Sequence, residues 1–236
     1  ELRAKVGFLF QSNALYDSMT VRENLEFPLR RHWIKVTAAE TNAKVMEVLT
    51  NVGLAHTVDM MPSELSGGMR KRIALARTLI LDPEIMLYDE PTTGLDPQAR
   101  RNLWELIKNI RSQGTTVIIT THYMDEAQRL ADRVAVLDHG NIVACDKPLT
   151  LIRNVVGHAV LELWGTGAAR CVSQIMRSQD APIEQRGETF YFRNEKADEM
   201  LEALKHSPQA DVDYIYRPGN LEDVFFSLTG RALRDD

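Results

Sequence analysis

The sequence predicts an α/β protein with a mostly parallel sheet and a helical subdomain, followed by a small α+β accessory domain. Short apolar runs bounded by turn signals, such as residues 85–88, have the pattern of buried parallel strands. Residues from about 15 to 65 read mainly as helices, and after about residue 155 short strands alternate with helices. We therefore predict a first domain at residues 1–154 and an accessory domain at residues 155–236.

The bulk composition is that of a soluble globular protein. With 236 residues the chain can bury one good core and a small second one. Hydrophobic residues make up 44% and charged residues 26%, and no apolar run approaches the roughly 18 residues of a membrane span, so a membrane role requires a partner. A net charge of −5 argues against a nucleic-acid partner. Cys145 and Cys171 lack metal-ligand spacing, which indicates free thiols in a reducing cytoplasm.

The first part of the chain contains one strand and then helices. Residues 6–10 read as a strand that ends just before Gln11. Two threonine–glutamate pairs have the spacing of capping boxes, which begin helices. These pairs are Thr20 with Glu23 and Thr37 with Glu40.

A glycine-rich entry opens the next helix, which runs to Ile80. Ser66, Gly67 and Gly68 stand at its start, and the two glycines let a ligand approach the backbone closely. The unpaired N–H groups and the positive end of the helix dipole favour an anion there, and the Ser66 hydroxyl adds a donor. Arg70, Lys71 and Arg72 on the same helix are interpreted as a solvated face. This stretch therefore predicts an anion-binding helix start.

A carboxylate pair follows the strand at residues 85–88. Asp89 and Glu90 lie at its C-terminal end, where open α/β sheets bind ligands. One carboxylate there can hold Mg²⁺, while its neighbour orients or deprotonates an attacking water. Asp96 then has the position of an N-cap, with Pro97 as the first residue of a helix at 97–112.

The remaining elements are a β-branched strand and a smaller mixed segment. Residues 115–121 are predicted to form a central strand, with His122 just past its end. His139 is interpreted as a hairpin turn residue that follows a strand at 134–137. Beyond residue 155 we expect strands and helices in the order 159–164 (strand), 168–178 (helix), 182–192 (hairpin), 196–206 (helix), 212–216 (strand) and 221–228 (helix).

Together these stretches resemble the ATP-binding-cassette (ABC) ATPases. LSGGMRKR at 65–72 is similar to their signature motif, IMLYDE at 85–90 to Walker B, and TTGLDP at 92–97 to the D-loop. Gln11 and His122 have the positions of the Q-loop glutamine and the switch histidine. The resemblance runs from Val6 to the C-terminal residues and implies a P-loop NTPase-like cassette fold with ATP and Mg²⁺ as cofactors.

The resemblance also implies roles for residues and a head-to-tail homodimer. The start of the signature helix would contact the γ-phosphate held by a second ATPase subunit, with Asp96 linking the two sites. On its own side, the chain would supply a metal ligand, a general base and a γ-phosphate sensor. The residues with these implied roles are Ser66, Gly67 and Gly68 in trans, Asp89 and Gln11 for the metal and its water, Glu90 as base, and His122 as sensor.

The phosphate-binding loop Gly-x-x-x-x-Gly-Lys-Ser/Thr does not occur in these residues. In the resembled family it precedes the Q-loop, so we expect a fragment truncated before Gln11 that is inactive alone. The other interpretation is a remnant that never carried the loop. Either way, a strand between residues 115–121 and 134–137 would be absent, which predicts a gap in the parallel sheet.

The two halves of the chain resemble different transporters. The first half is similar to phospholipid-trafficking ABC ATPases, and the part from about residue 100 onward to drug-export ATPases, as in a mosaic gene or an assembly artefact. We favour an exporter of drugs or other hydrophobic compounds, cytoplasmic and peripheral on the inner face of the bacterial membrane. An integral membrane permease would be its partner, docking near Leu15, Tyr16 and Phe27. The alternatives are a phospholipid-trafficking ATPase, a soluble non-transport ABC protein, and a catalytically dead interaction module.

Overall fold

A computed structural model describes residues 5–10, 14–31, 37–175, 184–206 and 211–230. The chain forms two compact units, Glu1–His122 and Tyr123–Asp236. The predicted boundary after residue 154 falls inside the second unit, at the end of a helix. The division into residues 1–154 and 155–236 stays a proposal.

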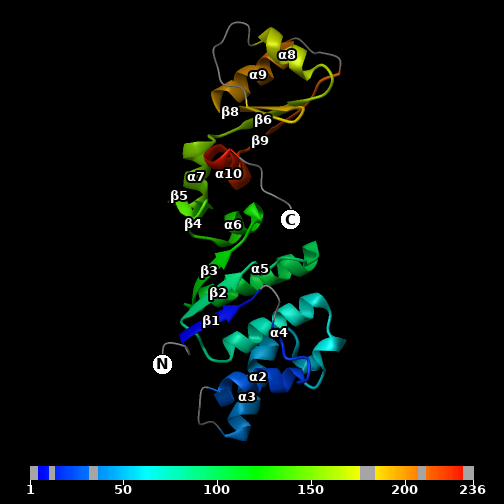
Figure 1. Cartoon of the computed structure of the whole chain (residues 1–236), viewed down its shortest axis with the longest axis vertical. Helices are drawn as coiled ribbons and strands as arrows, with labels where there is room; N and C mark the ends of the chain where they lie inside the picture. Colours follow the sequence, from blue (N-terminus) through cyan, green and yellow to red (C-terminus); the bar gives the residue numbers. More distant parts are fainter. Residues whose placement is uncertain (1–4, 11–13, 32–36, 176–183, 207–210, 231–236) are drawn as a thin grey trace. The chain divides into compact units, whose positions relative to one another are not determined.

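The first unit contains a three-stranded parallel sheet with the order β1-β2-β3, which confirms the predicted α/β class. Figure 1 shows this sheet beside α4 and α5. Because the register places Asp89 opposite Thr120, the C-terminal ends of β2 and β3 meet at one edge. The elements of this unit are β1 (Val6–Leu9), α2 (Val21–Arg31), α3 (Ala38–Asn51), two 3-10 turns (Ala55–Thr57 and Pro62–Glu64), α4 (Gly67–Leu79), β2 (Ile85–Asp89), α5 (Pro97–Ser112) and β3 (Thr116–Thr120).

The helical part packs around its own apolar cluster, built mainly from α2, α3 and α4. Both predicted capping boxes are confirmed. The Thr20 amide donates to Glu23 Oε2 at 2.7 Å, and the Thr37 amide donates to Glu40 Oε2 at 2.7 Å. These bonds satisfy amides that the first helical turn leaves without intrahelical partners. The buried apolar side chains of this cluster include Val21, Leu25, Val45, Leu49, Ile73 and Ala76.

The strand predicted to be central lies at an edge. Within the described strands, β3 pairs only with β2, and Ile118 is 53% exposed. β-Branched content indicates that a segment is a strand but does not say which strands flank it. The gap that the sequence predicts beside residues 115–121 would lie on this open side of β3.

Tyr88 on β2 carries a buried hydroxyl with no hydrogen-bond partner in the described part of the protein. Its side chain is 1% exposed, and burial raises the pKa of its phenol. Since a buried, unsatisfied hydroxyl destabilises the folded state, Tyr88→Phe is expected to raise the free energy of unfolding by about 1 kcal/mol. Tyr216→Phe is a control, because its hydroxyl donates to Asp198 at 2.6 Å. Urea titration of both variants checks this, and a less stable Y88F protein would contradict it.

The second unit begins with a helix and a β-hairpin. His139 and Gly140 have φ values of 47° and 77°, which confirms the predicted turn. The strand of residues 134–138 pairs antiparallel with the next strand, as expected of a hairpin. This segment forms α6 (Met124–Leu130), β4 (Val134–Asp138), β5 (Asn141–Asp146) and α7 (Pro148–Val155).

A four-stranded antiparallel sheet with the order β7-β8-β6-β9 completes this unit and confirms the predicted α+β segment. Leu161 and Leu163 of β6 pack with α8 and α9 on one face, while Val160 packs with α7 and α10 on the other. The cluster around Val160 therefore includes residues from both sides of position 154. The elements are β6 (Val160–Trp164), α8 (Ala168–Ile175), β7 (Glu184–Arg186), β8 (Thr189–Arg193), α9 (Glu195–His206), β9 (Asp213–Arg217) and α10 (Leu221–Thr229).

His158 connects the start of β6 to α9 through side-chain contacts. Its Nε2 lies 2.8 Å from Asp198 Oδ2, and its Nδ1 lies 2.7 Å from Asn194 Oδ1. The hydrogen bond that His158 donates to the Asp198 carboxylate is the largest cause that raises the pKa of His158. The pKa of Asp198 is lowered, first by the Tyr216 hydroxyl and then by His158.

These opposite shifts predict a bell-shaped pH dependence of stability. The raised pKa of His158 stabilises the fold fully below about pH 6.5, the ordinary histidine pKa, and this contribution is lost as the pH rises through the folded value. The lowered pKa of Asp198 stabilises it above about pH 4 and is lost as the pH falls. The stability difference between the parent and His158→Gln should therefore be largest between about pH 4 and pH 6.5. Denaturant titrations across pH would contradict this if the difference were flat.

Candidate active site

Asp89 and Glu90 stand at the C-terminal end of β2, as the sequence predicts. The Thr120 hydroxyl on β3 donates to Asp89 Oδ1 at 2.6 Å. The Glu90 amide donates to the Thr120 carbonyl oxygen at 3.0 Å, so the pairing of β2 with β3 extends one residue past the strand. The end of β3 therefore holds both the side chain of Asp89 and the backbone of Glu90.

Glu90 adopts an uncommon backbone conformation, with φ at 45°. A left-handed residue other than glycine is strained, and such residues cluster at functional sites. Two side-chain contacts orient its carboxylate. The Thr93 hydroxyl donates to Oε2 at 3.0 Å, and Nδ1 of His122 lies 3.3 Å from Oε1. The structure thus brings Asp89, Glu90 and His122 to the same edge of the sheet.

The signature segment forms the start of α4. Ser66 is the N-cap of this helix, and its Oγ accepts a hydrogen bond from the Met69 amide at 3.2 Å. A Cβ atom added at Gly67 would meet nothing within 4 Å, whereas one at Gly68 would lie 3.4 Å from Ala99 Cβ. Gly67 therefore leaves an open approach to the backbone, and a Cβ at Gly68 would be in ordinary van der Waals contact with Ala99 of α5.

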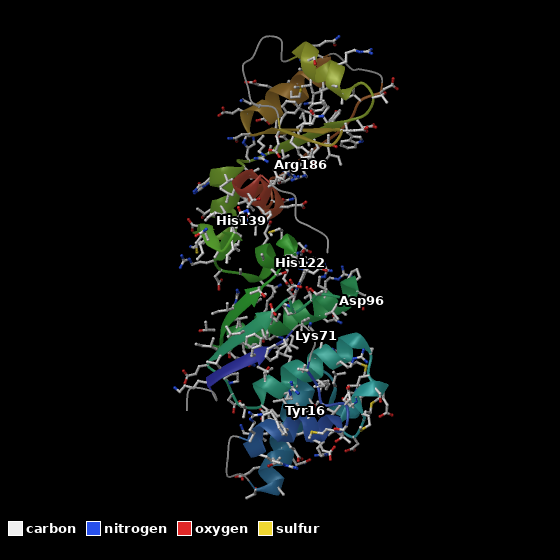
Figure 2. All side chains as sticks on the ribbon, viewed as in Figure 1. Tyr16, Lys71, Asp96, His122, His139 and Arg186 are labelled. Atoms are coloured by element: carbon white, nitrogen blue, oxygen red, sulfur yellow. The ribbon has the colours of Figure 1, made fainter. Side chains whose placement is uncertain are left out.

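Asp96 caps α5, as predicted. Its Oδ1 accepts hydrogen bonds from the amides of Gln98 and Ala99, both at 2.9 Å, and Pro97 is the first helical residue. Figure 2 labels Asp96 at this helix start. A cavity of about 440 Å³ lies between the starts of α4 and α5, so two helix N-termini with their positive dipole ends border one space. Residues lining it include Ser66, Gly67, Gly68, Gly94 and Asp96.

Lys71 lines the cavity between α4 and α5 and also reaches the sheet edge at Glu90. Its interpretation as part of a solvated face is wrong. The residue is 2% exposed, and its Nζ lies 3.5 Å from the carbonyl oxygen of Glu90 (Figure 2). Its neighbours bond to backbone as well, with Arg70 donating to the Leu65 carbonyl and Arg72 to the Val52 carbonyl. A run of basic residues on a helix does not indicate which of them other elements will bury.

Sequence reasoning also missed the two threonines that hold the carboxylates. Thr120 and Thr93 donate to Asp89 and Glu90 respectively. Thr93 lies three residues after Glu90, within the turn, so local spacing could have indicated it. Thr120 is distant in sequence and is brought near only by the strand register. Gln11, the predicted Q-loop residue, lies outside the described residues.

The donor set is compatible with a magnesium ion shared with a nucleotide. No group of three potential side-chain ligands converges anywhere in the described ranges. The protein therefore does not form a complete metal site from its own described side chains, and Asp89 offers a carboxylate oxygen at this edge. Mg²⁺ is commonly bound through one or two carboxylates, with waters and substrate phosphates completing its shell. The fold and this site together indicate a nucleotide-hydrolysing α/β ATPase.

Comparisons with known proteins give the family. Residues 1–93 match the family model "ABC transporter", and residues 169–230 match "Nodulation factor export protein NodI, C-terminal domain". The Nod factor export ATP-binding protein I of Paraburkholderia xenovorans (strain LB400) is 40% identical over 99% of this chain and 75% of its own length. The protein of the same name from Neorhizobium galegae is 39% identical over 98% of this chain and 65% of its own length.

A solved structure agrees with the sequence comparisons. It is described as the dimeric structure of a post-hydrolysis state of the ATP-binding cassette MJ0796 bound to ADP and Pi. It matches with a TM-score of 0.55 and 32% identity, covering 61% of this chain and 62% of that one.

The chain belongs to the family of ABC transporter ATP-binding proteins. This confirms the resemblance, the cassette fold and ATP as the nucleotide, since the family couples ATP hydrolysis to transport. The particular relatives it resembles are named for Nod factor export. Within the described ranges, no helix is long and apolar enough to cross a membrane.

Proposed function

We propose that the chain is the ATP-hydrolysing motor of an exporter for drugs or other hydrophobic compounds. The observation that carries the motor assignment is the Glu90 carboxylate, held 3.3 Å from His122 and adjacent in sequence to Asp89. Export is supported by the names of relatives that match nearly the whole chain, and by the match of its C-terminal part to the NodI C-terminal domain.

In this proposal each residue has a distinct task. Glu90 accepts a proton from the attacking water, and His122 contacts the γ-phosphate and orients the carboxylate. Asp89, with Gln11, holds Mg²⁺, which supplies charge neutralisation at the phosphates when bound.

The start of α4 would act on ATP bound by a second copy of the protein. Ser66, Gly67 and Gly68 would reach the γ-phosphate held by that copy, because the start of α4 offers unpaired amides. Asp96 caps the start of α5, which lines the same cavity as the start of α4. A homodimer is therefore the proposed working unit.

The membrane partner would dock on the helical part of the first unit. Tyr16 is 40% exposed, and its ring centroid lies 4.9 Å from that of Phe27. Arg77 Nη1 donates to the Ala14 carbonyl at 2.7 Å, and its guanidinium lies 5.6 Å from the Tyr16 ring centroid. An apolar helix of an integral permease would fit this aromatic pair, which would place the chain peripherally on the inner membrane face.

Export can be tested by expressing the complete gene with its neighbouring permease gene in a bacterium that lacks major efflux pumps. Energised efflux of a hydrophobic fluorescent dye is expected with the parent and not with the Glu90→Gln variant. If the parent and the Glu90→Gln variant gave the same dye efflux but different phospholipid distributions in the outer membrane, drug export would be contradicted and phospholipid trafficking favoured.

A further inference from the structure

β9 forms one edge of the four-stranded sheet in the second unit. Among the strands that the structure describes, only β6 pairs with it, and the register runs without a bulge from Asp213 opposite Trp164 to Arg217 opposite Val160. The three middle residues, Tyr214, Ile215 and Tyr216, are 45%, 49% and 42% exposed.

This edge lacks the usual protection against further pairing. Edge strands of monomeric proteins are commonly protected by proline, charged side chains or a bulge. In β9 the two charged residues, Asp213 and Arg217, stand at the ends, and the three residues between them are of the types that strands favour most. The outer backbone groups of β9 are therefore a template for another strand.

We propose that this strand is β9 of a second copy of the chain, paired antiparallel and centred on Ile215. The sequence D-Y-I-Y-R is self-complementary in this arrangement. Asp213 of each copy faces Arg217 of the other, Tyr214 faces Tyr216, and Ile215 faces itself. Aromatic pairs directly across two strands stabilise the pairing. Arg217 already binds Glu162 and Asp223 of its own copy, so the facing Asp213 contributes mainly to the choice of register. The interface is isologous, so one contact of two copies closes it.

Hydrogen bonds within each copy hold two side chains of β9, Tyr216 and Arg217, in place. The Tyr216 hydroxyl donates to Asp198 at 2.6 Å on the α9 side. On the α10 side, Arg217 donates to Glu162 at 2.6 Å and to Asp223 at 2.7 and 2.8 Å. Because these side chains are already ordered, less conformational entropy is lost on association. Pairing through β9 needs no nucleotide and would raise the effective concentration at which two cassettes meet.

The first test measures self-association of the full chain without nucleotide, by analytical ultracentrifugation. The parent is expected to dimerise with a dissociation constant of about 100 µM or lower. Ile215→Lys places two like charges directly opposite each other and should weaken the dimer by about tenfold or more. Ile142→Lys, at a strand position in the same unit that is 65% exposed, should leave the dimer unchanged. A monomeric parent, or equal dissociation constants for parent and I215K, overturns the proposal.

The second test fixes the register and does not depend on a destabilising change. Cys145 is exposed and Cys171 is buried, so Cys145→Ser gives a suitable background. In that background Ile215→Cys should form a covalent dimer with a short thiol-specific cross-linker, since residues directly opposite have Cβ atoms about 4.5–5.5 Å apart. Ile142→Cys is the matched control. Equal cross-linking at both positions, or none at Ile215, overturns the proposal.

Discussion

Replacing Glu90 with glutamine in the complete transporter is expected to lower ATP turnover by about 10²–10⁴-fold. The amide has nearly the same shape as the carboxylate but cannot accept a proton from the attacking water. Its oxygen can still accept the hydrogen bond from the Thr93 hydroxyl, so the turn after β2 should keep its geometry. Phosphate release by the ATPase assembled with its permease measures the effect.

Glu105→Gln provides the matched control for this prediction. Glu105 lies on the exposed side of α5 and contacts Lys108 at 2.8 Å, away from the β2–β3 edge. Its substitution should leave turnover unchanged, and nucleotide binding should persist in both variants. Turnover of the E90Q transporter within about a factor of two of the parent would refute the assignment of Glu90 as the general base.

Replacing Asp223 with alanine is expected to destabilise the second unit by about 2–4 kcal/mol. Asp223 is 1% exposed, lies in the first turn of α10, and accepts hydrogen bonds from Arg217 and from the Asn220 amide. Burial raises the pKa of its carboxyl group, but these bonds outweigh burial and hold the pKa below its usual value. Alanine would leave the half-buried Arg217 with Glu162 as its one carboxylate partner among the residues that the structure describes.

Glu222→Ala is the control for Asp223, because Glu222 is the preceding residue on the same helix turn and is exposed. Its loss should change the free energy of unfolding by about 0.5 kcal/mol or less. Chemical denaturation followed by circular dichroism measures both variants. Equal midpoints for D223A and E222A would show that the buried ion network does not stabilise α10.

Features that depend on residues close in sequence were predicted well. The caps at Thr37 and Asp96 satisfy amides two or three residues away, so their partners are visible in the sequence. The turn at His139 likewise needs only neighbouring residues. The carboxylates of Asp89 and Glu90 could be located because the end of a strand and the next two residues are read together.

Features that depend on distant partners were not predicted. Nothing near Lys71 in the sequence indicates that its ammonium group is buried beside Glu90. The helix α7 was missed, although Leu151 and Ile152 belong to the core that it shares with α10. β3 was predicted to be central, because strand composition does not specify the neighbouring strand.

The sequence alone determined the family, the element types, the helix caps and the identity of the residues at the sheet edge. Tertiary structure decided that His122, Thr120 and Glu90 meet, that Lys71 is buried, and that β9 is left with an open edge. The physical reason is range. Caps and turns are satisfied within a few residues, whereas strand order and side-chain burial depend on segments that only folding brings together.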